Sequence, residues 1–432
     1  MKRLPLCAFL LTAVAAAYAQ SGTNSPYSRF GLGMLSERAT GFNRGMNGLA
    51  MGCRRHNQVN MLNPASYSAI DSLTFIFDMG VSGQITNFKE NGNSKNAKNA
   101  NFEYVTAGFR AVRNVGIALG VVPLTNVGYD YSTTSFIGNS TATFTTTYSG
   151  TGGLHEAFLG VGWQPVNNFS IGVNGSYLWG DIENKSDVTF SDASVNASGR
   201  TYSAEVKSYR VNIGAQYSFH LDKNDWLTVG ATYSPGHSIG GKPKCYYRYT
   251  VSTSSTEVND TLSSYGGREL KLKLPTEVGA GLAWTHGSKW LVGLDWDWQK
   301  WSSYEQPEII ASGGSVSYGM RGGMYSDRHK FTLGTEFTPN SMSRRFLNRV
   351  NYRAGVSYAT SYYKFNSNNG PKELSASIGF GIPIQNSLNN RSILNVSGQW
   401  VREFGSTINE NSFRLTIGFT FNERWFAKWK VE

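Results

Sequence analysis

Hydrophobic and polar positions alternate most strictly near the end of the chain, from Ser412 to Phe421. The odd positions in this stretch are Phe or an aliphatic residue, and the even positions are small or polar. Side chains on a β-strand point to opposite faces in turn. The stretch therefore predicts a strand with one wholly apolar face and one face suited to a polar interior.

The same alternation recurs at intervals through most of the chain. The segments are 73–81, 102–112, 115–121, 155–163, 169–179, 209–219, 227–233, 270–284, 290–298, 331–337, 352–358, 374–382, 394–400 and 412–421. One set of connections is short (near 113, 166, 222, 287, 344 and 388), and the other set is mostly long. Short periplasmic turns opposite longer external loops are typical of bacterial outer-membrane barrels, whereas a soluble sandwich has no reason to sort its loops.

This pattern predicts an all-β fold, an antiparallel transmembrane β-barrel of about 14 strands in a Gram-negative outer membrane. The last strand must pair with the first, because the bilayer tolerates no free strand edge. The opposite strand faces carry Arg210, Asp295, Asp297 and Arg353, which we expect to face the lumen. Fourteen strands enclose more space than side chains alone fill, so water, a ligand or a plug must occupy the interior.

Four regions follow from these patterns. Residues 1–19 resemble a secretory signal peptide, with Lys2 and Arg3, an apolar core and a small-x-small cleavage site. Residues 20–71 show no sustained alternation and form the candidate plug or hatch; a flexible periplasmic leader is the alternative. Residues 72–421 form the barrel, and residues 422–432 a periplasmic tail. The external excursion 236–267 predicts either strands that rise above the membrane or a docking surface.

Composition agrees with a barrel without deciding the matter. Aromatic residues make up 13% of the chain, glycines number 48 and the mean hydropathy is −0.33, which also suits a secreted sandwich. The net charge of +11 brings no basic helix or zinc spacing that indicates nucleic acid. We therefore expect the partners to be outer-membrane lipid and lipopolysaccharide, with no nucleic acid. Cys53 and Cys245 lie in segments predicted on different sides of the membrane, and the sequence leaves open whether they are free.

No constellation of catalytic residues emerges. The six histidines lack metal-ligand spacing, and no nucleophile elbow or phosphate-binding glycine motif is present. Asp295 and Asp297 share a strand face that could bind a cation, although a hydrated lumen wall is the simpler interpretation. We predict no enzyme, no cofactor and no metal site.

Several short motifs resemble the FadL (long-chain fatty-acid transporter) family and its PorV-type relatives. They are Arg44 to Ala50 with the later Asn63-Pro64-Ala65, and further on Gly152-Gly153-Leu154, Leu274-Pro275-Thr276, Gly379 to Pro383 and the tail from Asn422 to Phe426. The resemblance implies a 14-strand barrel closed by an N-terminal hatch that includes Asn63, Pro64 and Ala65. It also implies a lateral gate beside a kinked third strand, for which Pro123 is the candidate; alternatively, Pro123 only begins an external loop.

Two functions remain open at this stage. The first is passive uptake of hydrophobic small molecules such as fatty acids. The second is a non-transporting partner or structural subunit of an outer-membrane secretion or assembly complex, with protein partners in that complex. In either case we expect the outer-membrane assembly machinery to act as a partner during insertion. The sequence identifies no substrate, partner protein or oligomeric state.

Overall fold

The computed structural model describes residues 22–90, 92–192, 194–251, 256–262, 270–312, 315–365, 368–384 and 392–423. The predicted signal peptide and the last nine residues of the tail lie outside these ranges. No helix in the described part is long and apolar enough to cross a membrane.

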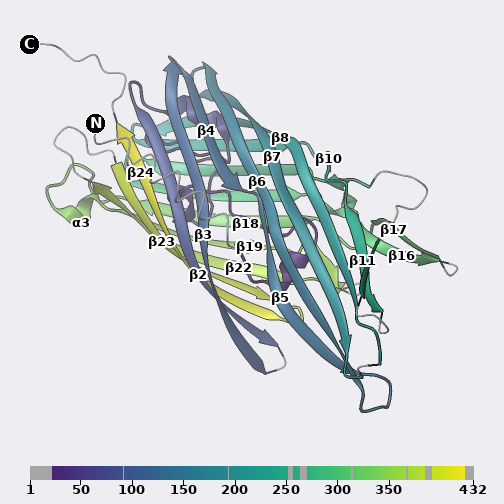
Figure 1. Cartoon of the computed structure of the whole chain (residues 1–432). Coiled ribbons are helices and arrows are strands. Elements are labelled where there is room, and N and C mark those ends of the chain that lie inside the picture. Colours follow the sequence, from purple (N-terminus) through teal and green to yellow (C-terminus); the bar gives the residue numbers. More distant parts are fainter. Residues whose placement is uncertain are drawn as a thin grey trace, which may run out of the picture.

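Within the described residues, fourteen strands form a closed antiparallel barrel (Figure 1). In order around the wall they are β2 (Phe75–Glu90), β3 (Asn93–Val112), β4 (Val115–Pro123), β6 (Thr143–Val166), β7 (Phe169–Phe190), β8 (Ser198–Asp222), β9 (Asp225–Ser234), β14 (Glu277–His286), β15 (Trp290–Gln299), β18 (Arg328–Phe337), β19 (Asn351–Ala359), β22 (Lys372–Ile384), β23 (Ser392–Phe404) and β24 (Asn409–Glu423). The predicted all-β barrel is confirmed.

The barrel closes where β24 pairs with β2, from Phe75 opposite Glu423 to Lys89 opposite Asn409. Outward positions along the strands are apolar and exposed, as at Leu159, Ile378 and Phe413. Exposed apolar rows of this kind suit contact with lipid chains, while the inward positions are mostly glycine, hydroxyl or charged residues.

The two ends of the barrel differ. At one end the strands join in short turns, at Arg113-Asn114 and at Asn167-Asn168, where Asn114 and Asn168 have positive φ values of 64° and 68°. At the other end β6, β7 and β8 run for 24, 22 and 25 residues. Since about 9–11 residues cross a bilayer, these strands extend beyond it, which marks this end as external.

Smaller elements cap the external end. β11 (Lys244–Val251) and β12 (Thr256–Leu262) form a hairpin that continues the sheet from β8, so this excursion rises as strands. β16 (Gln306–Ser312) pairs with β17 (Ser315–Arg321), and β20 (Lys364–Phe365) pairs with β21 (Asn368–Asn369). The short helix η4 (Trp301–Ser303) also lies at this end, whereas α3 (Phe346–Arg349) lies in the connection between β18 and β19 at the end with the short turns.

One predicted strand boundary is wrong. The alternation through 270–284 predicts a single returning strand, but β13 (Leu272–Lys273) pairs with β10 (Ser238–Gly240) instead of continuing β14. Leu272 is buried in a cluster of apolar side chains at the external end. The alternation there therefore reflects a connection that folds back over the rim, which also buries every second residue.

Candidate functional site: the plugged lumen and the interrupted wall

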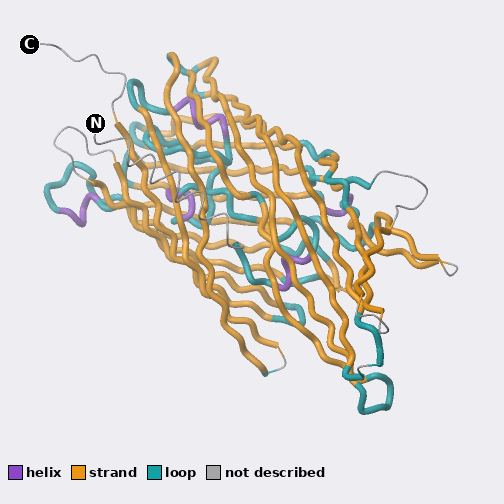
Figure 2. Tube along the Cα trace, in the orientation of Figure 1, coloured by secondary structure: helices purple, strands orange, loops and turns teal. Residues whose placement is uncertain are grey.

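The N-terminal segment, residues 22–70, lies inside the barrel, and Figure 1 shows it as the purple chain behind the front strands. It contains η1 (Pro26–Arg29), β1 (Met34–Leu35), α2 (Gly41–Arg44) and η2 (Pro64–Ala69). Figure 2 shows short helices enclosed by the strand wall. Its first described residues lie beside the external parts of β3 and β5, and η2 lies near the short turns. We call residues 22–70 the plug.

The predicted hatch residues lie at the start of η2. The Asn63 side chain accepts a hydrogen bond from the Ala65 backbone N–H (3.2 Å) and donates one to the Met51 carbonyl (2.9 Å). Pro64 occupies the first helical turn, where a missing N–H costs nothing. All three hatch residues are buried. This arrangement fixes two distant parts of the plug, near residues 51 and 64, to each other.

Two rows of lumen-facing glycines receive the plug backbone. Gly116, Gly162, Gly172 and Gly214 stand directly opposite one another on β4, β6, β7 and β8, and Gly293, Gly334 and Gly355 do the same on β15, β18 and β19. A Cβ at Gly116 would lie 1.9 Å from the Tyr67 carbonyl oxygen, and one at Gly355 would lie 2.5 Å from that of Met46. Any side chain at these positions would therefore displace the plug.

The first of three charge networks joins the plug to β3. Arg44 lies 2.7 Å from a Glu103 carboxylate oxygen, and both side chains are almost fully buried. Ser82 donates a hydrogen bond to the other Glu103 oxygen, and the Arg44 Nε donates to the Ala39 carbonyl (2.8 Å). Glu103 reaches inward where the β2–β3 register shifts, between Gly80 and Val81.

The second network crosses the lumen. Arg38 of the plug and Arg210 of β8 share Glu277 of β14, at 3.0 and 2.6 Å. Both arginines also approach Glu156 of β6, at 3.7 and 3.4 Å. Two guanidinium groups and two carboxylates thus neutralise one another inside the barrel.

The third network lies on the opposite wall. The Arg353 Nε donates to Glu336 (2.7 Å), whose other oxygen accepts from Arg55 of the plug (2.6 Å). Arg353 also donates to Asn395 (2.6 Å) and stacks over the Phe42 ring of the plug. Each of the three networks contains one plug arginine, so the plug is linked by charge to several wall strands at once.

The two predicted lumen aspartates have different roles. Asp295 accepts hydrogen bonds from the backbone N–H groups of Ala50 and Met51, at 2.6 and 2.9 Å. Asp297 lines a cavity of about 130 Å³ together with Arg38, Lys330 and other residues of both signs. Among the described residues, no group of three or more His, Cys, Asp or Glu side chains is arranged to hold a metal.

The barrel wall is interrupted beside Pro123. β4 pairs with β3 only as far as Val121 opposite Val105, and the chain then resumes as β5 (Thr125–Phe136), which pairs with β6. No hydrogen-bonded pairing joins β3 to β5 in the described residues, and the two strands diverge toward the external end in Figure 1. Pro123 therefore lies at a break in the ladder. We call the region between β3 and β5 the seam.

The plug covers the inner part of the seam. β1 pairs with Thr125 and Asn126 of β5, and the Ser28 hydroxyl contacts the Gly128 backbone. On the other side, Asn101 of β3 donates to the Gly22 carbonyl (2.8 Å). The missing wall pairing is thus replaced by contacts with the plug.

The external half of the lumen holds a cluster of aromatic and aliphatic side chains. Tyr27 and Leu32 of the plug pack there with Trp301, Tyr325, Tyr362 and Tyr363 among others. The Phe30 ring stacks on Tyr363 at a centroid distance of 5.1 Å. Nearby, a cavity of about 130 Å³ has a lining that includes Ile182, Tyr202, Leu272 and Tyr318.

The sequence patterns missed the acidic partners and the glycine rows. Glu156, Glu277 and Glu336 stand at inward positions of their strands, as Arg210 and Arg353 do, so strand alternation alone would have placed them in the lumen. Glu103 breaks the alternation of β3, because it lies at the register shift between β2 and β3. The glycine rows carry a comparable signal, because inward glycines recur on neighbouring strands. Cys53 and Cys245 are free and buried in the structure, in the plug and in β11.

The structure is thus that of a plugged outer-membrane barrel, and comparisons with other proteins place it in a family. The family model described as BamG matches residues 1–432, and the chain belongs to this family. No protein with a curated description matches.

Similar solved structures are transport barrels. The Pseudomonas putida toluene transporter TodX is 13% identical, with 92% of this chain and 100% of that chain covered and a TM-score of 0.59. The Ralstonia pickettii toluene transporter TbuX is 10% identical (90% and 98% covered, TM-score 0.58). A Pseudomonas aeruginosa FadL homologue is 14% identical (89% and 98% covered, TM-score 0.58). These likenesses show the shared fold and include no enzyme. The PorV-type resemblance stays a prediction.

Proposed function

We propose that this protein is an integral outer-membrane barrel that does not transport, and that it serves as a structural subunit or partner in an outer-membrane secretion or assembly complex. The observation that carries the proposal is the charged closure of the lumen. Three networks of buried or partly buried guanidinium and carboxylate groups cross from the plug to the wall.

An apolar substrate would have to displace these groups to pass. Removing one partner of a buried ion pair leaves an uncompensated charge, at a cost of about 3–5 kcal/mol. The cavity beside the plug has a mixed lining, with Leu35, Met51 and Trp298 beside Arg38 and Lys330, so a hydrocarbon that entered it would still meet charged groups. The long external strands β6, β7 and β8 offer a surface outside the membrane for protein partners.

The first test is purification from the native outer membrane in mild detergent, followed by mass spectrometry of everything that accompanies the barrel. We expect a fixed set of proteins at constant stoichiometry and no apolar molecule in the lumen. A bound fatty acid or similar molecule without a stoichiometric protein would overturn the proposal.

Uptake of hydrophobic small molecules, such as fatty acids, is the second candidate. It is favoured by the seam beside Pro123 and by the fold shared with toluene transporters. The cavity at the external end, where Ile182 and Leu272 lie beside Arg29 and Glu308, gives an entering molecule a partly apolar lining. Liposomes that contain the purified barrel would measure it directly. Toluene or oleate entry that exceeds entry into protein-free liposomes, and that a plug variant changes, would establish this candidate instead.

A further inference from the structure

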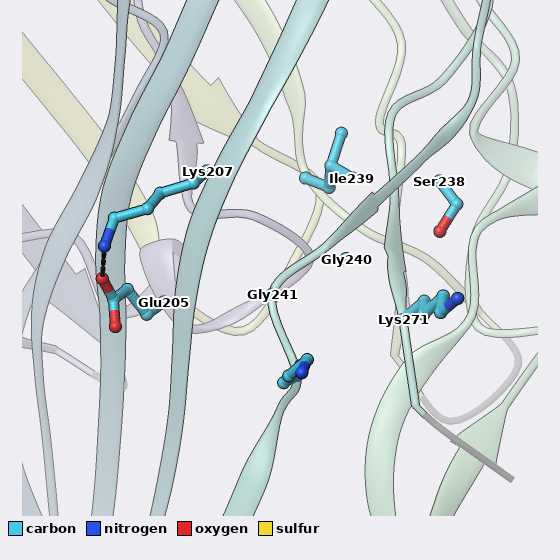
Figure 3. A pocket seen from close by; sticks show the side chains of 8 residues that line it. Glu205, Lys207, Ser238, Ile239, Gly240, Gly241 and Lys271 are labelled. Carbon is cyan, nitrogen blue, oxygen red and sulfur yellow. Dashed lines mark ion pairs between the residues drawn. The ribbon is translucent and has the colours of Figure 1, made fainter.

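A hollow on the outer surface of the barrel lies apart from the lumen. It has a volume of about 490 Å³ and lies between β8 and the turn that follows β10, as Figure 3 shows. Lys207, Lys242 and Lys271 line it from three separate parts of the chain, and Glu205 is the acidic residue in the lining. The lining therefore has an excess of formal positive charge.

The residues that form the floor of the hollow are anchored by apolar side chains that point into the barrel. Ile239 and Leu272 are buried in the aromatic and aliphatic cluster at the external end of the lumen. After Ile239 the chain turns through Gly240 and Gly241, with φ values of 70° and 84°, a conformation that glycine adopts without a steric penalty. This places Lys242 at the rim, and the pairing of β10 with β13 brings Lys271 alongside.

The hollow faces the surroundings of the barrel. Lys207 and Glu205 occupy the same face of β8 as Tyr209 and Ile213, which are 61% and 48% exposed. Those two side chains belong to the outward apolar row that we assign to lipid contact. Lys207 thus stands one outward position beyond the last aromatic residue of the row.

Aromatic side chains mark this level as the interface between lipid and water. Tyr177 stands opposite Tyr209, Trp179 stands opposite Lys207, and Tyr209 stacks on His237 at 4.4 Å. Tyr and Trp concentrate where lipid headgroups begin. A lysine hollow directly outside this band lies at the depth of the phosphate groups of the outer leaflet.

We propose that the hollow binds the phosphate-bearing headgroup of an outer-leaflet glycolipid of the lipid A kind. The lysine ammonium groups contact the phosphate, and the acyl chains run along Tyr209 and Ile213. A soluble phosphate would have the same charge, but it would gain nothing from the apolar row below. Position on the membrane-facing surface therefore favours the lipid.

Glu205 opposes this binding. It lies 2.5 Å from the Lys207 ammonium group, as the dashed line in Figure 3 shows. The hydrogen bond and charge of Lys207 lower the pKa of Glu205, so Glu205 stays ionised at neutral pH and competes with phosphate for the lysine. The charges in the hollow thus predict opposite effects for changes to the lysines and to Glu205.

The test is titration of the full-length protein in mild detergent with bis-phosphorylated lipid A, followed by native mass spectrometry. The triple variant Lys207→Ala/Lys242→Ala/Lys271→Ala should weaken binding by about tenfold or more, because each lysine near a phosphate surface contributes to the attraction. The matched control Lys89→Ala/Lys95→Ala/Lys98→Ala removes the same charge from the β2–β3 hairpin and should bind as the wild type does. Glu205→Gln should bind more tightly.

The two sources of phosphate separate in the same experiment. Dephosphorylated lipid A should bind equally to the wild type and to the triple lysine variant. Millimolar inorganic phosphate should not displace bis-phosphorylated lipid A from the wild type. Full displacement of lipid A by inorganic phosphate would show that the hollow binds a soluble anion, and it would overturn the proposal of a lipid ligand. Equal binding by the triple variant and the wild type would overturn the site altogether.

Discussion

The inner and outer halves of the lumen are closed by different means. In the inner half, plug residues 37–70 lie on glycine rows and are joined to the wall by buried ion pairs. In the outer half, plug residues 22–36 pack into an aromatic cluster and cover a seam that lacks wall pairing. The inner half is therefore a fixed closure, and any opening of this barrel would begin in the outer half.

The largest effect should follow from breaking an inner ion pair. Arg44→Met leaves Glu103 buried without its partner and should lower the free energy of unfolding by about 3–5 kcal/mol. Urea unfolding followed by tryptophan fluorescence measures this change.

A matched control for this prediction is the exposed pair formed by Lys185 and Glu183, at 2.6 Å. Lys185→Met should change the free energy of unfolding by less than about 1 kcal/mol, because water screens exposed pairs. The double change Arg44→Met/Glu103→Gln should recover much of the lost stability, since no buried charge then remains unpaired. Equal losses of unfolding free energy in the Arg44 and Lys185 variants would show that buried ion pairs do not stabilise the inner half.

A smaller effect should follow from filling a glycine row. Gly116→Val would place side-chain atoms against the Tyr67 carbonyl, so η2 must shift, at a cost of about 1–3 kcal/mol. We expect a lower unfolding temperature and a measurable ion conductance in planar bilayers. Gly175→Val is the control, because a Cβ there meets nothing within 4 Å. A Gly116→Val variant with unchanged unfolding temperature and conductance would contradict the close contact between plug and wall.

The sequence predicted the barrel well because lipid and lumen impose a period of two on every strand. The same alternation placed Arg210, Asp295 and Arg353 on the inward face. It could not tell which residues meet across the lumen, because Arg38 and Glu277 are far apart in the chain and share no pattern. The plug has no period at all, so its path depends on contacts such as that of Tyr67 with Gly116, which only the folded wall creates.

The outer half should respond to pH through a pair of neighbouring carboxyl groups. Glu403 and Glu410 stand opposite each other near the external ends of β23 and β24, and Ser25 of the plug donates a hydrogen bond to Glu410 (2.6 Å). Burial raises the pKa of Glu410 to about 7 from 4.5, and burial with the neighbouring Glu410 charge raises the pKa of Glu403 well above its ordinary range. The folded state therefore holds more protons than the unfolded state above about pH 4.5.

Stability contributed by this pair is present at low pH and is lost as the pH rises through 7. We expect hydrogen exchange at residues 25–30, corrected for its intrinsic pH dependence, to accelerate between pH 5 and pH 8. Glu403→Gln removes one of the two charges and should flatten the response. Faster exchange at pH 5 than at pH 8 would show that protonation of Glu403 and Glu410 does not stabilise the outer half.

The smallest effect should come from Pro123→Ala. Proline lacks a donor for the β-ladder, but it lies at the end of β4, where strands tolerate it. Alanine restores one N–H while the plug still covers the seam through β1, so we expect a stability change of about 1 kcal/mol or less and unchanged permeability to toluene in liposomes. A gate that depends on a kink at Pro123 requires the opposite, a clear loss of entry in the variant. If the wild type admits toluene and the variant does not, the seam opens in the wild type. That result would favour uptake of hydrophobic molecules over the proposed non-transporting subunit.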